Sequence, residues 1–218
     1  MVKNKLDKIL LIVFFIFAAL FQGCAKTVTI IPSAGTILSI EFSLRSEPTS
    51  SSKYFVIIAT NEAYQLPSLT SYDELLEPGE APQAGGQTEE YYYTNYYSTW
   101  ASYIAIDKNF GSFSAKGPFI FGQTATKESV STYSISGETI SIQINLDKLF
   151  ADASTISQFY IDIAAVDHPD ASYKLLNDRL SSSNFIKVLT GEMIYGNDTE
   201  DSSIDSALDI KNWKVKIE

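Results

Sequence analysis

Residues 38–45 read LSIEFSLR, in which apolar and polar side chains alternate without a break. A period of two is typical of a β-strand with one face in the core and the other in water. Residues 139–146, TISIQINL, show the same alternation and predict a second strand of this kind. Residues 54–59 and 159–166 are instead largely apolar on both faces, which predicts central strands covered on both sides. These four stretches indicate a fold built from sheets.

Weaker strand patterns are distributed along the rest of the chain. They cover residues 28–31, 91–97, 99–106, 118–121, 129–135, 185–189 and 210–217. Roughly ten short strands separated by clusters of Gly, Pro, Ser and Asn are typical of an antiparallel sandwich or barrel. Helical patterns are scarce, with short turns expected at 146–150 and 172–180. We therefore predict an all-β fold, a single antiparallel β-sandwich over residues 24–218.

The first two dozen residues form a separate unit. Three lysines, Lys3, Lys5 and Lys8, precede an apolar run over residues 9–21, and Cys24, the only cysteine, follows shortly after. A basic start, a short apolar core and a small residue before the cleavage point are typical of a secretion signal. The apolar run is too short to remain as a membrane-spanning helix. Residues 1–23 are therefore predicted to be removed.

The end of this signal resembles the lipobox of bacterial lipoproteins, which reads Leu, two small residues and a Cys that becomes acylated. The corresponding residues are Phe21-Gln22-Gly23-Cys24. Gly23 and Cys24 fit the pattern, whereas Phe21 and Gln22 depart from it and Leu20 stands one place early. The resemblance implies that Cys24 carries the lipid. The alternative is an ordinary secretion signal followed by an unmodified thiol.

The lipoprotein resemblance and the charge together restrict the partners. Ala25 stands where enteric lipoproteins retained in the inner membrane often have Asp, so the resemblance implies transport to the outer membrane. Because three of 16 basic and one of 26 acidic side chains lie in the signal, the mature part has a formal charge of −12. Nucleic acid is excluded as a partner, because phosphate contacts need clustered basic residues. The acidic surface also repels anionic headgroups, so attachment depends on acyl chains on Cys24.

Residues 54–107 carry eight carboxylates and no Lys or Arg, and residues 62–87 form an unusually long connection that contains Pro67, Pro78 and Pro82. Aromatic residues follow at Tyr91, Tyr92, Tyr93, Tyr96, Tyr97 and Trp100. Flat rings with polar edges suit stacking on sugar rings or on a protein partner. The competing interpretation is a Tyr-rich strand with one face in the core, because Tyr is a favoured strand residue.

A second acidic cluster precedes the last predicted strand and has no base nearby in sequence before Lys211. The cluster contains Asn197, Asp198, Glu200, Asp201, Asp205 and Asp209, of which Asp198, Glu200, Asp201 and Asp205 are the candidate calcium ligands. Calcium takes six to eight oxygen ligands from such loops, although the spacing is not that of an EF-hand. The sequence leaves two interpretations open, a calcium site and a solvated loop.

Catalytic motifs are weakly represented. His168, the only histidine, lies in an Asp-His-Pro-Asp turn, and no nucleophile elbow, zinc-binding His pair or phosphate loop accompanies it. We therefore expect no enzymatic activity, with a carboxylate-pair glycosidase as the alternative, because such an enzyme needs only two suitably placed acids.

The order of the strands over 54–59, 100–106, 140–146 and 159–166, with a final strand containing Trp213, resembles envelope β-sandwiches of the carbohydrate-binding or DOMON type. The resemblance is confined to strand order and carries over no site residue. The leading hypothesis is a non-catalytic, lipid-anchored lipoprotein that presents the 62–90 loop and the aromatics to a glycan or an envelope protein. The alternatives are a structural or assembly lipoprotein without a small ligand, and a glycan-cleaving enzyme.

Overall fold

A computed structural model describes residues 35–69, 74–83, 87–168, 173–180 and 183–218. The predicted signal, Cys24 and the strand predicted at 28–31 lie outside this part of the chain. Among the described residues, no helix has the length and apolar character needed to cross a membrane.

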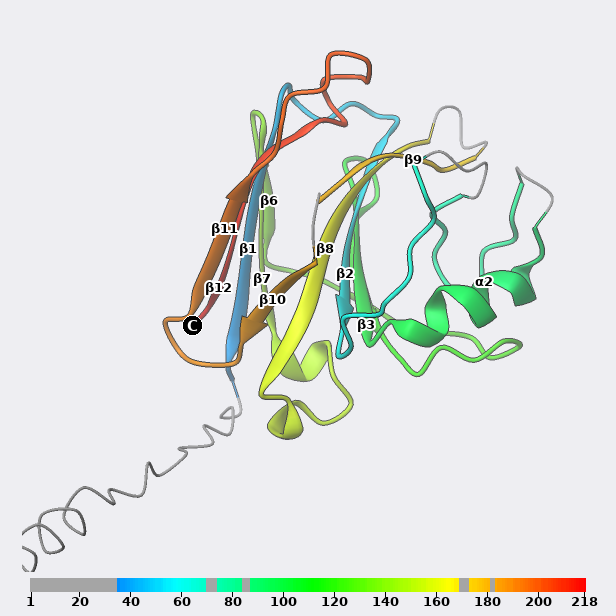
Figure 1. Cartoon of the computed structure of the whole chain (residues 1–218), viewed down its shortest axis with the longest axis vertical. Coiled ribbons are helices and arrows are strands. Elements are labelled where there is room, and N and C mark those ends of the chain that lie inside the picture. Colours follow the sequence, from blue (N-terminus) through cyan, green and yellow to red (C-terminus); the bar gives the residue numbers. More distant parts are fainter. Residues whose placement is uncertain (1–34, 70–73, 84–86, 169–172, 181–182) are drawn as a thin grey trace, which may run out of the picture.

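Two antiparallel sheets pack face to face, which confirms the predicted all-β sandwich (Figure 1). The five-stranded sheet has, in spatial order, β11 (Met193–Asn197), β12 (Ile210–Ile217), β1 (Ile37–Leu44), β7 (Thr139–Asn145) and β6 (Tyr133–Ser136). The seven-stranded sheet has the order β10 (Asn184–Lys187), β8 (Gln158–Asp167), β2 (Ser52–Ala59), β3 (Ser102–Asp107), β4 (Gly111–Lys116) and β5 (Lys127–Ser129), with β9 (Leu175–Arg179) also paired to β8.

The first core lies between the two sheets and contains the apolar halves of the alternating stretches. Leu38, Ile40, Phe42 and Leu44 of β1 are buried there, as are Ile140 and Ile142 of β7. The same register places Ser39 and Glu41 on the opposite face of the sheet, because successive side chains of a strand point to opposite sides. The alternation in residues 38–45 and 139–146 therefore identified the buried face correctly.

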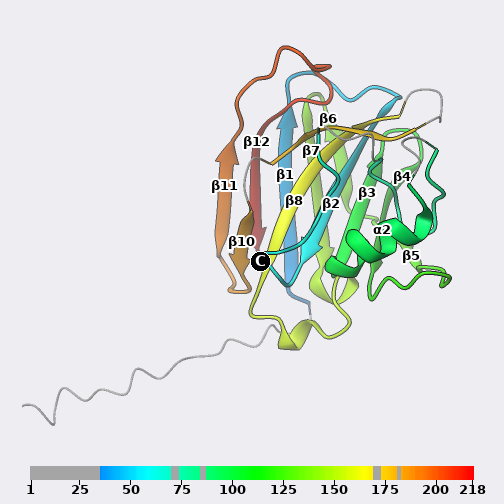
Figure 2. The ribbon, with the colours of Figure 1, turned by 45° about the vertical axis from the view of Figure 1, so that its right-hand side comes forward.

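A third layer covers the outer face of the seven-stranded sheet. It contains the segment after β2, helix α2 (Glu89–Asn95) and the helical turn η1 (Tyr97–Thr99), and Figures 1 and 2 show α2 lying against that sheet. A second core fills the space between this layer and the sheet. Phe55 and Ile57 of β2 face the second core, whereas Tyr54 and Val56 face the first. Strand β2 is apolar on both faces because both faces are covered.

The prediction of a strand at 91–97 is wrong, because most of these residues form helix α2. Thr88 caps the helix by accepting a hydrogen bond from the Tyr91 N–H at 3.2 Å, and Glu89 and Glu90 lie in the first turn near its positive end. Tyrosines four residues apart then share one face, which packs into the second core. Local capping and burial of this face outweigh the strand preference of tyrosine.

Other boundaries also differ from the prediction. Residues 118–121, predicted as a strand, form the connection between β4 and β5. The turn predicted at 172–180 contains strand β9 instead. The predicted turn at 146–150 begins with the 3₁₀ turn η2 (Leu146–Lys148), and a second, η3 (Ala153–Thr155), follows it.

Candidate functional site

The predicted aromatic site does not form an exposed platform. Tyr92, Tyr93, Tyr96, Tyr97 and Trp100 are all at most 8% exposed, and only Tyr91 is half-buried. The rings contact one another, as in the pair Tyr97 and Trp100, whose ring centroids lie 5.0 Å apart at an angle of 62°. Rings enclosed in this way are not accessible for stacking on a sugar, so their arrangement favours the interpretation that they pack in a core.

The polar edges of these aromatics bind the backbone of the third layer. The Tyr97 hydroxyl donates to the Leu76 carbonyl at 3.0 Å, and the Trp100 indole donates to the Gln65 carbonyl at 2.8 Å. The Tyr92 hydroxyl accepts from the Glu74 N–H at 2.7 Å. The aromatic cluster therefore fixes the long connection after β2 to the sheet.

Two carboxylates of the same segment, Glu77 and Glu80, pair with lysines outside it. Glu77 is buried, and its oxygens lie 2.6 Å from the ammonium groups of Lys53 on β2 and Lys127 on β5. The Tyr103 hydroxyl donates to Glu77 at 3.1 Å. Burial alone would raise the pKa of Glu77, but the two lysines outweigh it and hold that pKa at about 2. Glu80 pairs with Lys174 in the same way.

Buried Asp162 on β8 is a second polar contact between the sheet and the layer that covers it. One of its oxygens accepts from the Tyr64 hydroxyl at 3.1 Å and pairs with Arg179 of β9. Burial raises the pKa of Asp162 to about 6, and Arg179 opposes the shift without reversing it. Asp162 therefore connects the third layer to the sandwich, as does the ion cluster of Glu77, Lys53 and Lys127.

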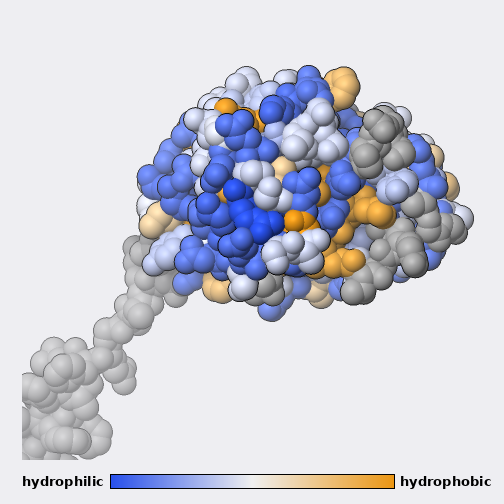
Figure 3. Space-filling model, turned by 90° about the horizontal axis from the view of Figure 1, so that it is seen from above, coloured by the Kyte–Doolittle hydropathy of each residue, from blue (hydrophilic) through white to orange (hydrophobic). Residues whose placement is uncertain are grey.

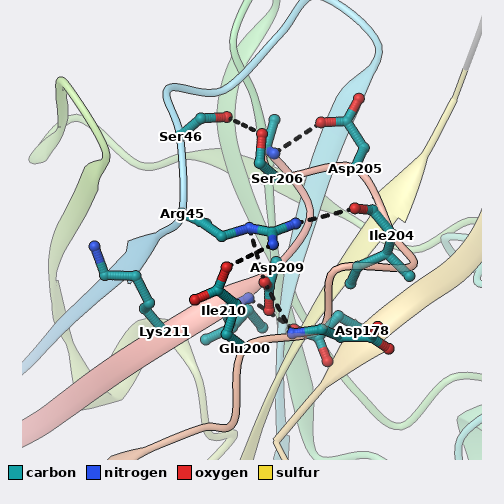
Figure 4. A network of polar contacts seen from close by, with 12 residues as sticks. Arg45, Ser46, Asp178, Glu200, Ile204, Asp205, Ser206, Asp209, Ile210 and Lys211 are labelled. Carbon is teal, nitrogen blue, oxygen red and sulfur yellow. Dashed lines mark hydrogen bonds and ion pairs between the residues drawn. The ribbon is translucent and has the colours of Figure 1, made fainter.

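The acidic loop between β11 and β12 is organised around a cation from another part of the chain (Figure 4). Arg45, just after β1, lies 2.9 Å from Glu200 and 3.1 Å from buried Asp209. The loop has no nearby base in sequence, and Arg45, 155 residues from Glu200, supplies the positive charge instead.

The remaining acids of this loop bind local backbone groups. Asp201 accepts from the Ser203 N–H and Asp205 from the Ala207 N–H, each at 2.8 Å, while Asp198 accepts from the Thr199 N–H at the same distance. Within the described part of the chain, no three His, Cys, Asp or Glu side chains converge as a metal would require. The arrangement favours a hydrogen-bonded surface loop. Viewed from above, this end of the molecule is mainly hydrophilic, with hydrophobic residues on the half toward α2 (Figure 3).

His168 lies directly after β8. Its backbone N–H donates to the Ser51 carbonyl at 2.8 Å, and its ring Nδ1 lies 3.3 Å from the Tyr173 carbonyl oxygen. Both contacts are with backbone carbonyls, as is typical of a residue that forms part of a turn.

The outer face of the five-stranded sheet carries a polar surface that no sequence motif marks as a site. Residues that are paired across an antiparallel sheet point to the same side. The register therefore places three rows of side chains on this face. The rows are Met193, Lys216, Ser39 and Gln143; Tyr195, Lys214, Glu41, Ser141 and Ser134; and Asn197, Asn212, Ser43, Thr139 and Ser136.

A groove with a volume of about 510 Å³ runs along the first two rows, from Met193 on β11 to Thr132 before β6. Its lining combines hydroxyl, amide and charged groups, among them Ser141 and Gln143. The two carboxylates that line it, Glu41 and Glu218, accept hydrogen bonds from lysine ammonium groups at 2.9 and 3.0 Å. We call this surface the polar groove.

An exposed aromatic lies beside the polar groove. Tyr195 on β11 is 72% exposed and is paired with Lys214, one of the residues that line the groove. Its neighbour Gly196 faces inward, where an added Cβ would lie only 2.8 Å from the ring of Trp213. The close packing of Trp213 against this glycine holds β11 on the sheet and directs Tyr195 outward.

Comparison with known proteins identified no matching family model, curated protein or solved structure.

Proposed function

We propose that this chain is a non-catalytic, lipid-anchored protein of the bacterial cell envelope whose polar groove binds carbohydrate. The observation that carries the proposal is the alignment of polar side chains from five strands along one groove, with exposed Tyr195 beside it.

The chemistry of the groove suits a sugar chain. Sugar hydroxyls are both donors and acceptors, and they match the hydroxyl, amide and carboxylate groups of Ser141, Gln143 and Glu41. The ring of Tyr195 supplies a flat surface with a polar edge, as sugar faces require. Five paired strands fix the backbone positions of these residues, so a ligand does not have to order the backbone when it binds.

The same contacts argue against hydrolysis in this groove. A glycosidase of the carboxylate-pair type needs one carboxylic acid that holds a proton for the leaving group. Glu41 and Glu218 instead accept hydrogen bonds from Lys214 and Lys216. Binding without cleavage is therefore the favoured activity.

The anchor is proposed on Cys24, from the signal and lipobox-like residues before it. Cys24→Ser is expected to abolish incorporation of labelled palmitate and to release the protein from the membrane fraction. Incorporation that continues in this variant would contradict the assignment. Recovery of the wild-type protein in the inner membrane would contradict its proposed location in the outer membrane.

Carbohydrate binding can be tested with the acyl-free mature chain on a panel of insoluble and immobilised polysaccharides. Tyr195→Ala and Gln143→Ala are expected to weaken retention on the polysaccharide that the wild type binds. Phe185→Ala is the control, because Phe185 is an exposed aromatic on β10 of the seven-stranded sheet, on the face opposite to the first core and away from the groove.

Equal loss of binding in Tyr195→Ala and Phe185→Ala would refute the groove as the site. Failure of the wild type to bind any polysaccharide on the panel would favour the structural or assembly role. Release of soluble sugars from a labelled glycan would instead favour the enzyme.

A further inference from the structure

Two consecutive apolar side chains are exposed on the connection between β4 and β5. Ile120 and Phe121 are 46% and 50% exposed, whereas the preceding Phe119 is buried in the second core. The ring of Phe121 also contacts Tyr93, with centroids 5.6 Å apart. The connection is therefore fixed at its base by Phe119 and presents Ile120 and Phe121 to the outside.

This connection lies at the end of the sandwich where the described chain begins. The Leu146 N–H at the start of η2 donates to the Thr36 carbonyl at 3.0 Å, one residue before β1. The Lys116 ammonium group, at the end of β4, donates to the Asp147 carbonyl of η2 at 3.1 Å. In Figure 1 the start of β1 and the yellow-green turns η2 and η3 lie together at the bottom of the molecule.

The acidic loop lies at the opposite end. Arg45, which contacts Asp209 and Glu200, follows the last residue of β1, whereas Thr36 precedes its first residue. The carboxylates that would be repelled by anionic headgroups are thus separated from Ile120 and Phe121 by the length of a strand. One end therefore presents the carboxylates of the acidic loop, and the other presents the apolar side chains of Ile120 and Phe121.

We propose that Ile120 and Phe121 contact the lipid surface and orient the anchored domain with its acidic loop pointing away from the membrane. The proposal rests on the proposed anchoring at Cys24. Ten residues separate Cys24 from Gly35, and a chain of that length spans at most about 40 Å when fully extended. The tether therefore keeps this end of the domain close to the bilayer, where insertion of two apolar side chains removes them from water.

The test uses the mature chain coupled through Cys24, its only cysteine, to a maleimide lipid in neutral phosphatidylcholine vesicles. Coupling makes the test independent of acylation in the cell, which the palmitate experiment measures separately. Phe121→Trp reports contact with bilayers that contain brominated lipid, because bromine quenches tryptophan emission on contact. Phe110→Trp is the matched control, since Phe110 is exposed on the β3–β4 turn, where neighbouring Lys108 binds the Pro48 carbonyl at the acidic end.

The proposal predicts that brominated vesicles quench the added emission of Phe121→Trp and leave that of Phe110→Trp unchanged. The native Trp100 and Trp213 are buried, so the wild type provides the baseline. Equal quenching in the two variants, or none in either, would overturn the proposal. A shift of the Phe121→Trp emission that requires whole envelope membranes and is absent from vesicles would assign the turn to a protein partner, which also overturns it.

Discussion

The ion cluster at Glu77 provides a stringent test of how the third layer is held. Replacement of Glu77 by Gln keeps the shape of the side chain and removes its charge, which leaves the ammonium groups of Lys53 and Lys127 without their common partner. Removal of one member of a buried ion pair typically costs about 3 to 5 kcal/mol. We expect Glu77→Gln to lower the free energy of unfolding at pH 7 by an amount in this range.

The pH dependence of the free energy of unfolding gives a second, independent estimate of what the Glu77 carboxylate contributes. The pKa of Glu77 is about 2 in the folded chain, against an ordinary value of 4.5. A carboxyl group with a lowered pKa stabilises the fold fully above its unfolded pKa, and this contribution is lost as pH falls toward the folded pKa. The shift corresponds to about 3 kcal/mol at pH 7, of which about 2 kcal/mol is lost between pH 5 and pH 3.

Urea unfolding of the wild type and of Glu77→Gln at pH 7, 5 and 3 measures both effects. The variant is expected to lack this part of the pH dependence, so that the two proteins approach each other in stability at pH 3. Glu128→Gln is the control, because Glu128 forms an exposed pair with Lys148, and exposed pairs contribute little. An unchanged difference between wild type and Glu77→Gln across these pH values would refute the assigned role of the cluster.

Three further predictions concern the first core and the acidic loop. Ile142→Ala should cost about 2 to 4 kcal/mol because Ile142 is buried, whereas Ser141→Ala should change stability by less than about 0.5 kcal/mol; equal losses in thermal unfolding would contradict the assigned face. Asp209→Asn should cost about 1 to 3 kcal/mol, because buried Asp209 contacts Arg45 and accepts from the Asp201 N–H, and a neutral result in urea unfolding would contradict this. Millimolar calcium should leave the melting temperature unchanged, since Arg45 and backbone N–H groups already bind the carboxylates of the loop; a rise that EGTA reverses would instead establish a calcium site.

The sandwich could be predicted because its strongest signals are local. The alternation in residues 38–45 and 139–146 depends only on the geometry of an extended chain. The apolar faces of residues 54–59 also indicated a strand covered on both sides. The identity of the covering layer could not be predicted, because it comes from the long connection after β2, which lacks any periodic pattern.

The aromatic segment carries a helix signal in its own sequence. Thr88 followed by Glu89 and Glu90 is typical of a helix start, and Tyr92 and Tyr96 have the spacing of one helical face. The strand preference of tyrosine favoured the wrong element, and with it an exposed platform.

The charge partners and the polar groove depend on tertiary structure. Arg45 meets Glu200 across 155 residues, and Lys174 meets Glu80 across 94. The groove likewise combines Ser141 with Lys214, and both were visible only as polar residues of alternating strands. Their alignment depends on the order and register of five strands, which the period of each strand alone does not specify.

The most direct test of the proposed function is an amide NMR titration of the acyl-free mature chain with the polysaccharide fragment that it retains best. The proposed site predicts that the perturbed amides cluster on the polar groove, at Ser39, Glu41, Ser141, Gln143 and Tyr195. Perturbations confined to the third layer or to the acidic loop, with the amides of the groove unchanged, would contradict it.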